Sequence, residues 1–330
     1  MKIFHTEDLK KYNFLVTGGG GFIGSNIVEY LLLNNAGKVR VVDNFSTGFR
    51  ENIYEFQDKD NFELIEDDIT NLSVCKRACS DIDFVIHQAA IGSIPRSMKD
   101  PITTNLSNVN GFLNMLVAAR DANVKRFVYA SSSSVYGDNE LLPKKEENIG
   151  NLLSPYAVTK RVNELYAEIF HKIYGIEVIG LRYFNVFGPR QHSTSPYAAV
   201  IPLFFKNIFN NTSPQIYGDG EQTRDFTFVE NAVQANIKAV FCKNSNAIAN
   251  VFNVACGNSI SINKLFALIK SITESNINPE YKEPRQGDIR QSLADISKAK
   301  NILQYDPQIN IEKGLKLYYK WYKTNYELQL

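Results

Sequence analysis

The chain has 330 residues, of which 44% are hydrophobic and 22% are charged, with 19 glycines and 11 prolines. These values are ordinary for a globular protein of about two domains, so they exclude collagen-like, low-complexity and disordered scaffolds. The net charge is only +1, so we expect no nucleic-acid partner, and any bound anion must be held by a few placed groups.

The N-terminal segment does not resemble a signal peptide, because four charged side chains between positions 7 and 11 interrupt it. No apolar stretch approaches the roughly 18 residues of a membrane span. Cys75 and Cys79 lie four apart on an expected helix, and no histidine accompanies them. We therefore expect a cytoplasmic protein with no membrane partner, no bound metal and reduced, mostly buried thiols.

Short runs of β-branched and aromatic residues alternate with helical patterns through the first half. The predicted strands are Asn13–Thr17, Val39–Asp43, Phe62–Ile65, Asp83–His87, Lys125–Ala130 and Glu177–Arg182. Near-continuous apolar strands alternating with helices predict a parallel sheet covered on both faces. Because crossovers in such sheets are right-handed, the favoured fold is α/β with a doubly wound, Rossmann topology.

The alternation of strands and helices ends after Arg182, where segments rich in Pro, Gly, Asn and Ser follow. This change predicts a smaller mixed α/β lobe. Two helices are expected at Phe228–Phe241 and Ile262–Ile272, and Val251–Ala255 could return to the sheet as another strand. The expected division is a Rossmann domain of residues 1–185, with 228–256 returning to it, and a lobe of residues 186–227 and 257–330.

The C-terminal segment Glu312–Tyr326 mixes lysines with Tyr318, Tyr319, Trp321 and Tyr322. This composition could form a helix on a membrane surface, but we expect a terminal helix that packs its aromatic side chains on the small lobe.

A glycine-rich turn follows the first predicted strand and opens the first helix. Gly18, Gly21 and Gly24 give G-x-x-G-x-x-G spacing, with Phe22 and Ile23 inside it. Without Cβ atoms the backbone N–H groups can approach a pyrophosphate at the helix N-terminus. Roughly 20 residues further on, an acid ends the second strand, where a carboxylate accepts from the adenosine ribose of a dinucleotide. A plain glycine turn is the alternative interpretation.

That acid is Asp43, which would repel a 2′-phosphate and so favours NAD over NADP, although Arg50 is near enough to leave NADP open. Asp68, after the third strand, is expected near the adenine, with a surface carboxylate as the alternative. Ala89 and Ala90 follow the fourth strand and leave room for a cofactor. His87, just before them, is interpreted as a packed strand-end residue rather than a base.

The expected chemical centre begins a helix at Ser154-Pro155, where Ser154 is a plausible N-cap and Pro155 fits the first turn. Tyr156 and Lys160 are then one helical turn apart on one face. A free phenol has a pKa of about 10, and a nearby ammonium and a nicotinamide cation would lower it toward the working range of a base. An amphipathic helix with an exposed lysine is the alternative.

Four serines, Ser131–Ser134, leave the strand 125–130 at the carboxyl edge, where ligands of such sheets bind. A serine there can hold a sugar hydroxyl and relay its proton to Tyr156. A polar turn is the alternative.

These motifs resemble the extended short-chain dehydrogenase/reductases that act on nucleotide sugars. TGGGGFIG, SSSSVYGD and SPYAVTK carry the resemblance, which extends through LRYFNVFGPRQ, GDGEQTRDF and RQGDIRQSLADISKAK. HQAAIGSIPRSMKDPITTN and NVNGFLNMLVAARDA are similar to signatures of bacterial UDP-N-acetylglucosamine 4-epimerases.

The resemblance implies three sets of site residues. The catalytic set would be Ser132, Tyr156 and Lys160. The set that holds NAD would be Gly18, Gly21, Phe22, Ile23, Gly24, Asp43, Asn44, Ser46, Gly48, Asp68, Ile69, Gln88, Ala89, Ala90, Tyr156 and Lys160. The set that holds the UDP-sugar would be Gly92, Ser93, Ser132, Ser133, Tyr156, Asn185, Ala199, Val200, Gln215, Tyr217, Arg224, Arg285, Asp288 and Ser292.

The side chains of the third set suit that ligand. Arg224 and Arg285 offer forked donors for a diphosphate, and Tyr217 can stack on uracil. The small side chains at 92, 199 and 292 would leave volume for a 2-acetamido group, to which Ser133 could hydrogen-bond.

The resemblance thus implies a cytoplasmic isomerase with tightly bound NAD, which epimerises C4 of a UDP-N-acetylhexosamine through a 4-keto intermediate for surface polysaccharide precursors. A homodimer is implied too, with its interface near Asn105–Arg120 and Tyr156–Phe170. UDP-glucuronate, UDP-N-acetylglucosaminuronate and UDP-glucose stay open as substrates. A dehydratase is disfavoured because Ser133-Ser134 replace its Asp–Glu pair, and a silent NAD-binding regulator is disfavoured by Tyr156 and Lys160.

Overall fold

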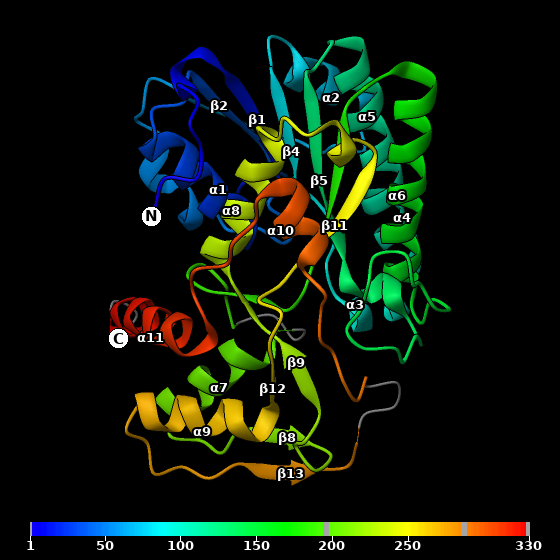
Figure 1. Ribbon diagram of the computed structural model, residues 1–330. Coiled ribbons are helices and arrows are strands. Elements are labelled where there is room, and N and C mark those ends of the chain that lie inside the picture. Colours follow the sequence, from blue (N-terminus) through cyan, green and yellow to red (C-terminus); the bar gives the residue numbers. More distant parts are fainter. Residues whose placement is uncertain (1, 194–197, 285–288, 328–330) are drawn as a thin grey trace.

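The computed structural model describes residues 2–193, 198–284 and 289–327, and its centre is a seven-stranded parallel sheet (Figure 1). The strand order is β11-β6-β5-β4-β1-β2-β3. The strands are β1 (Asn13–Thr17), β2 (Lys38–Val42), β3 (Phe62–Ile65), β4 (Phe84–His87), β5 (Arg126–Ser132), β6 (Val178–Tyr183) and β11 (Asn250–Val254). This order confirms the predicted doubly wound fold and the return of the segment near 251–255 as a strand.

Helices cover both faces of the sheet. On one face α1 (Phe22–Leu33) packs against α8 (Val229–Val240), and on the other α5 (Gly111–Asp121) packs between α2 (Leu72–Cys79) and α6 (Pro155–Tyr174). Successive strand side chains point to opposite faces, so Phe14 and Val16 of β1 join the first core, whereas Leu15 joins the second.

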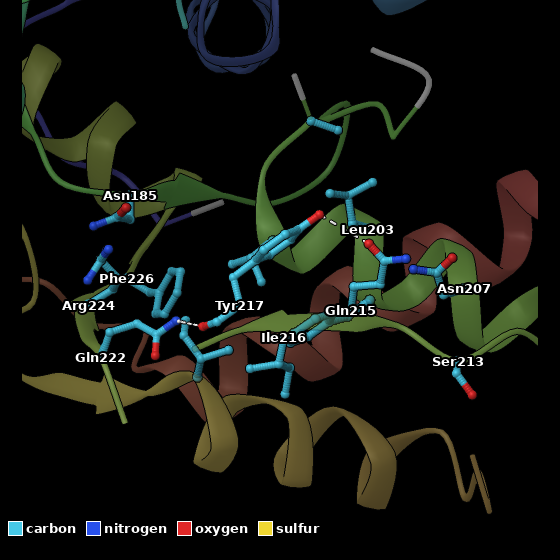
Figure 2. Close-up of a pocket in the computed structure, with 14 residues that line it drawn as sticks. Asn185, Leu203, Asn207, Ser213, Gln215, Ile216, Tyr217, Gln222, Arg224 and Phe226 are labelled. Atoms are coloured by element: carbon cyan, nitrogen blue, oxygen red, sulfur yellow. Dashed lines mark hydrogen bonds between the residues drawn. The ribbon is translucent and has the colours of Figure 1, made fainter. Parts of the chain in front are cut away.

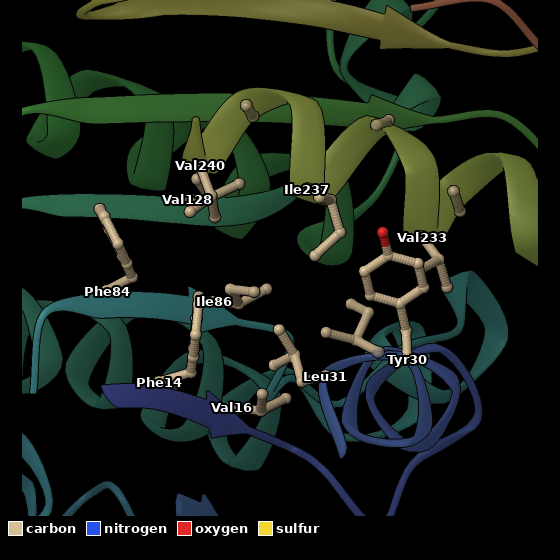
Figure 3. Packing of buried hydrophobic residues seen from close by; sticks show 14 of the residues in the cluster. Phe14, Val16, Tyr30, Leu31, Phe84, Ile86, Val128, Val233, Ile237 and Val240 are labelled. Carbon is tan, nitrogen blue, oxygen red and sulfur yellow. The ribbon is translucent and has the colours of Figure 1, made fainter. Parts of the chain in front are cut away.

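Figure 3 shows the first core, in which Tyr30 and Leu31 of α1 meet Val233 and Ile237 of α8 over the strands. Burial on both faces explains why these strands have almost uninterrupted apolar sequences.

The small lobe lies beyond the carboxyl ends of the strands (Figure 1). Its helices are α7 (Val200–Phe209), α9 (Ile262–Ile272) and α11 (Ile311–Glu327). Its strands pair as β8 (Gln215–Tyr217) with β13 (Glu280–Lys282), and β9 (Thr223–Asp225) with β12 (Ser259–Ser261). At the junction, β7 (Val186–Phe187) pairs with β10 (Thr227–Phe228). Helix α10 (Ser297–Leu303) packs on β11 and α8, so this part of the C-terminal segment lies with the sheet.

The C-terminal helix α11 packs its aromatic side chains on the small lobe, as expected. The rings of Tyr318 and Tyr322 lie 5.1 and 5.8 Å from the ring of Phe205 of α7. None of the described helices has the length and apolar character needed to cross a bilayer. Cys75 and Cys79 are both buried free thiols.

His87, at the end of β4, is a packed residue, as its position in the sequence suggests. It is buried between Phe112 and Phe127, and its Nδ1 lies 2.9 Å from the hydroxyl of Thr17. Burial, with the charge of Lys160, lowers its pKa to about 3. A charged imidazolium is thus incompatible with this core.

The His87 pKa predicts a pH-dependent stability. Because the folded pKa lies below the ordinary 6.5, this contribution to the free energy of unfolding is complete above pH 6.5 and is lost as the pH falls toward 3. A drop from pH 6.5 to 5 should remove roughly 2 kcal/mol. His87→Phe should be less stable than the wild type at pH 7 but show a shallower loss between pH 7 and 5 in urea unfolding. An unchanged pH dependence would contradict this assignment.

Candidate active site

A cavity at the carboxyl edge of β1, β2 and β4 gathers most of the predicted cofactor residues. It is lined by Gly18, Gly21, Val42, Asp43, Asn44, Ser46, Thr47, Gly48, Asp67, Asp68, Ile69, Gln88, Ala89, Ala90, Ile91 and Ser107. Phe22 and Ile23 do not line it; they form the first turn of α1, and their side chains pack into the cores. Gly24 lies in that same turn.

The glycines are required by close backbone packing around this cavity. Gly18 has φ +68°, and a Cβ atom there would lie 2.7 Å from the backbone nitrogen of Ala89. A Cβ atom on Gly24 would overlap the carbonyl oxygen of Gly18. Any side chain at these positions would therefore displace the turn that presents its amides at the start of α1.

Asp43 is buried at the end of β2 and is held by backbone amides. The amides of Gly20 and Phe45 each donate to its carboxylate at 2.8 Å. Burial raises its pKa, and these amides oppose the shift. Arg50 is the residue that left NADP open as the cofactor. Both of its terminal nitrogens donate hydrogen bonds to the carboxylate of Glu66. The charge of Arg50 is therefore compensated by Glu66, which leaves it less suited to hold a 2′-phosphate.

Residues of the predicted catalytic set meet in a second cavity of about 850 Å³. Tyr156 begins α6, where Ser154 caps the helix by accepting from the Ala157 amide at 3.1 Å, as predicted. Ser132 ends β5 on the same cavity. Ser97 of α3 (Ile94–Lys99) is fully buried and accepts from the amide of Tyr156 at 3.1 Å, a positioning contact that the sequence did not indicate.

Lys160 lies beneath this cavity rather than on the surface. It is buried, its Nζ donates to the carbonyl oxygen of Ala130 at 2.8 Å, and it lies 5.9 Å from the centre of the Tyr156 ring. Burial lowers its pKa to about 8, against the charge of Glu164, which raises it. The lysine is therefore close to losing its proton at the upper end of the physiological range.

The phenol of Tyr156 differs from the expectation. Burial raises its pKa above 10, and the hydrogen bond with Ser132 only partly opposes this. The chain by itself thus keeps Tyr156 protonated, because the desolvation of the phenolate outweighs its polar neighbours. A bound nicotinamide cation would add positive charge beside the phenol and so favour its ionised form.

A third cavity of about 420 Å³ lies in the small lobe (Figure 2). Its lining includes Val200, Leu203 and Asn207 of α7 and Gln215 and Tyr217 of β8. The phenol of Tyr217 donates to Gln215 Oε1 at 3.1 Å. An aromatic ring held in this way is suited to stack on a planar base.

Asn185 and Arg224 line both the second and the third cavity and so join them. One terminal nitrogen of Arg224 donates to the carbonyl oxygen of Ile289 at 2.6 Å. Ser93, Ser133 and Ser292 line the second cavity. Two predicted ligands, Arg285 and Asp288, lie outside the described residues.

Two of the remaining substrate residues do not line these cavities. Ala199 is exposed at the N-cap of α7, between the cavity-lining Ala198 and Val200. At Gly92, which precedes α3, an added Cβ atom would meet no atom within 4 Å. Sequence reasoning also missed Ile94, Met98 and Leu153, which form an apolar side of the second cavity. Apolar residues in short loops and helices carry no pattern that distinguishes a cavity wall from a core.

Among known proteins, the NAD dependent epimerase/dehydratase family matches residues 14–255. The chain belongs to this family. The membership confirms the family resemblance of the motifs, and NAD is accordingly the cofactor.

Solved structures of 4-epimerases align with almost the whole chain. The UDP-N-acetylglucosamine 4-epimerase of Methanobrevibacter ruminantium, in complex with UDP-N-acetylmuramic acid, is 42% identical and covers 95% of this chain and 99% of its own, with a TM-score of 0.90. The UDP-glucose 4-epimerase of Thermotoga maritima with UDP-glucose is 36% identical, with coverage of 95% and 99% and a TM-score of 0.89. The UDP-glucuronic acid 4-epimerase of Bacillus cereus, with UDP-glucuronic acid and NAD, is 32% identical, with coverage of 95% and 100% and a TM-score of 0.88. The acetamido-sugar enzyme among them is archaeal, whereas the motifs indicate the bacterial group.

The first cavity fits the cofactor of this epimerase/dehydratase family. A Cβ atom on Gly18 or Gly24 would meet backbone atoms within 3 Å, so these positions need glycine, and the start of α1 can then lie close to a pyrophosphate. Asp43 and Asp68 line the cavity where the ribose and adenine would lie. Ala89 and Ala90 also line it, and their small side chains leave space for the cofactor.

We expect Gly24→Ala to weaken NAD binding at least roughly tenfold, because the added methyl group forces the turn apart. The purified variant should contain little nucleotide when it is denatured and the released NAD is measured by chromatography. Gly92→Ala is the matched control, since its methyl group meets open space, and it should keep its NAD. A Gly24→Ala protein with a full complement of NAD would contradict the proposed position of the pyrophosphate.

Proposed function

We propose that the protein is a UDP-sugar 4-epimerase that interconverts UDP-N-acetylglucosamine and UDP-N-acetylgalactosamine. The observation that carries the proposal is the junction of the two cavities. Tyr156 and Ser132 line one of them, Tyr217 and Gln215 line the other, and Asn185 and Arg224 border both. A molecule that fills both cavities would have a planar base at one end, an anionic linker in the middle and a sugar at the other end.

The proposed proton path runs through the hydroxyls of the second cavity. NAD, when bound, accepts a hydride from C4 of the sugar and returns it. Tyr156 takes the proton of the 4-hydroxyl, directly or through Ser132, with which it shares a hydrogen bond. Lys160, 5.9 Å from the phenol ring, favours the ionised form of Tyr156 for as long as it keeps its own proton.

The UDP moiety anchors the substrate while the sugar turns. Arg224 is placed for the diphosphate, Tyr217 for stacking on the base, and Val200 and Gln215 for the rest of the nucleoside. The 4-keto sugar can then present its opposite face to the hydride. Because the cofactor is regenerated in each cycle, we infer that NAD stays bound between turnovers.

Small side chains around the second cavity favour an acetamido sugar. Ser292 and Ser133, both with small side chains, line it. UDP-glucuronate and UDP-glucose are the alternative substrates, since relatives of similar identity act on them. Ser133 and Ser134 provide hydroxyls rather than the acid pair that a dehydratase uses.

The first prediction concerns the substrate. The purified protein should convert UDP-N-acetylglucosamine into its galacto epimer without added NAD, as measured by chromatography of the nucleotide sugars. Absence of this conversion, with turnover of UDP-glucuronate or UDP-glucose instead, would refute the acetamido preference but not the 4-epimerase assignment.

The second prediction concerns the base. Tyr156→Phe should lower kcat by roughly a thousandfold, since it removes the group that takes the proton, while KM changes little. Tyr174→Phe, on the same helix but exposed, is the matched control and should keep full activity. Full activity of the Tyr156 variant would refute the proton path.

We also infer a homodimer from an exposed apolar surface on α6 and on α4 (Pro101–Asn105), which pack against each other (Figure 1). The surface contains Ile102, Leu165, Ile169 and Ile173, which are 45–73% exposed. A contiguous apolar surface of this kind on a soluble enzyme is a typical subunit interface. Its occupant would be the same surface of a second copy, related by a two-fold axis.

Replacement of both Ile102 and Ile169 by Glu should convert the dimer into a monomer, because four carboxylates would be buried in the symmetric interface. Light scattering coupled to size exclusion should then give the 37.4 kDa mass of one chain. Leu33→Glu, an exposed leucine on α1, should leave the dimer intact. A wild-type protein that is monomeric at micromolar concentration would contradict the inference.

A further inference from the structure

Asp225, the last residue of β9, is a fully buried carboxylate that faces backbone amides. Its Oδ1 accepts from the amide of Cys256 at 3.0 Å. Its Oδ2 accepts from the amides of Gly257 at 3.0 Å and Ala294 at 3.4 Å. Within residues 2–193, 198–284 and 289–327, no basic side chain forms an ion pair with it.

The chain segments that meet at Asp225 are those that carry residues of the two substrate cavities. Its carbonyl oxygen accepts from Asn185 Nδ2 at 3.2 Å. Arg224 precedes it, and Ser292 lies on the segment that its Oδ2 holds through Ala294. The same segment is bound to β9 again where the amide of Ser292 donates to Thr223 at 3.2 Å. Asp225 itself lines neither cavity.

An ionised carboxylate in this place is costly, because burial disfavours the charge and only peptide dipoles compensate for it. Burial accordingly raises its pKa to about 6, although the amides of Cys256, Ala294 and Gly257 oppose the shift. A buried apolar side chain would avoid this cost but could not accept from three amides on two segments. The charge of Asp225 therefore serves to hold these two segments in place rather than to raise the free energy of unfolding.

We infer that Asp225 is a positioning residue for substrate binding, which holds Arg224, Asn185 and the segment of Ser292 in the arrangement that receives the nucleotide portion of the UDP-sugar. This inference rests on the proposed function in taking the two cavities as the UDP-sugar site. It assigns to Asp225 an effect on affinity and none on the chemical step.

Protonation would undo this arrangement, because a neutral carboxyl group turns one acceptor oxygen into a donor that faces amide donors. The titratable groups that face Asp225 are the thiol of Cys256 and the phenol of Tyr305. Burial raises the pKa of Cys256 to about 12 and that of Tyr305 well above 10, with the charge of Asp225 adding to both, so neither changes charge between pH 5 and 8. The charged groups on the adjoining segments are Arg224, which precedes Asp225, and Lys144. The backbone of Lys144 pairs with that of Ala294.

Asp225→Asn tests the inference through binding of UDP alone, measured by calorimetry at pH 7.5 and 5.5. The substitution keeps one acceptor but turns an amide donor toward the backbone amides, so we expect UDP to bind roughly ten- to a hundredfold more weakly at pH 7.5. The terminal phosphate of UDP itself takes up a proton in this range. Between pH 7.5 and 5.5 the wild type should therefore lose several-fold more affinity than the variant, because only the wild type also protonates the Asp225 carboxylate.

Asp295→Asn is the matched control. Asp295 lies one residue beyond Ala294, but its carboxylate accepts from the amide of Ser297 at 2.9 Å and lines neither cavity. It should bind UDP as the wild type does at both pH values. In turnover assays, Asp225→Asn should raise KM for the UDP-sugar by the same factor as the loss of UDP affinity and change kcat by less than about threefold. A merely structural defect would lower the active fraction, and hence kcat and the NAD content, instead.

Wild-type affinity of Asp225→Asn for UDP, or a wild-type affinity that does not fall toward pH 5.5, would overturn the inference. If Asp225→Asn does not fold, binding of UDP-glucose to the wild type decides the matter, because this ligand has no terminal phosphate that titrates in this range. A several-fold fall toward pH 5.5 would support the inference, and a constant affinity would overturn it. UDP binding also separates this inference from the proposed function. A protein that binds UDP in a manner dependent on Asp225 but epimerises no UDP-sugar would refute only the proposed function, whereas a wild type that does not bind UDP would refute both.

Discussion

The site depends on one buried ion pair, between Glu164 of α6 and Arg182 of β6. Arg182 donates to the two carboxylate oxygens at 2.8 and 2.9 Å, and the hydroxyl of Ser131 donates to the same carboxylate at 2.6 Å. Tyr156 and Lys160 are on α6, whereas Ser132 is on β5, so no local structure sets the distance between them. Glu164 contributes most of the polar contacts that set it, because it attaches the helix to Ser131, while Lys160 adds a hydrogen bond to the carbonyl oxygen of Ala130. Breaking such a pair from one side typically costs about 3–5 kcal/mol, since it leaves the other charge buried and unpaired.

The same network continues away from the sheet. Arg182 also donates to the carbonyl oxygen of Glu146 at 2.8 Å, and its guanidinium lies 5.0 Å from the centre of the Tyr136 ring. The phenol of Tyr136 donates to Asn253 at 2.6 Å, and Asn253 in turn donates to the carbonyl oxygen of Asp295 at 2.9 Å. Asp225 holds the neighbouring residue, Ala294, from the small lobe. Two buried carboxylates, Glu164 and Asp225, thus fix the cavity from its two sides.

The sheet could be predicted because each strand is buried on both faces, and burial leaves an apolar signature that needs no knowledge of the partners. The N-cap of α6 could also be predicted, because Ser154 and the amide that it accepts from, that of Ala157, are only three residues apart in the sequence. The motifs predict the catalytic set, and the fold brings Ser132 and Tyr156 to one cavity, but the motifs do not predict the pKa shifts there. An exposed Lys160 is only the alternative interpretation of the sequence, but its complete burial, which lowers its pKa, arises from β5 and α6 together. Ser97 could not be found, because its contact with Tyr156 spans 59 residues.

The distribution of polar groups over the two substrate cavities fits a reaction in which a sugar must turn over. Directional groups are gathered on the nucleotide side, where Arg224, Asn185 and Gln215 would hold UDP in one orientation. The sugar side offers hydroxyls from Ser132, Ser133 and Ser134 and an apolar wall from Ile94 and Met98. Hydroxyls rotate and both donate and accept, so they can serve either epimer. Strong fixed contacts to the sugar would favour one face and slow the return of the hydride, whereas strong contacts to UDP stabilise both orientations equally. A net charge of only +1 is therefore compatible with the binding of two diphosphates, since backbone amides would contact one of them and a few side chains, such as Arg224, would contact the other.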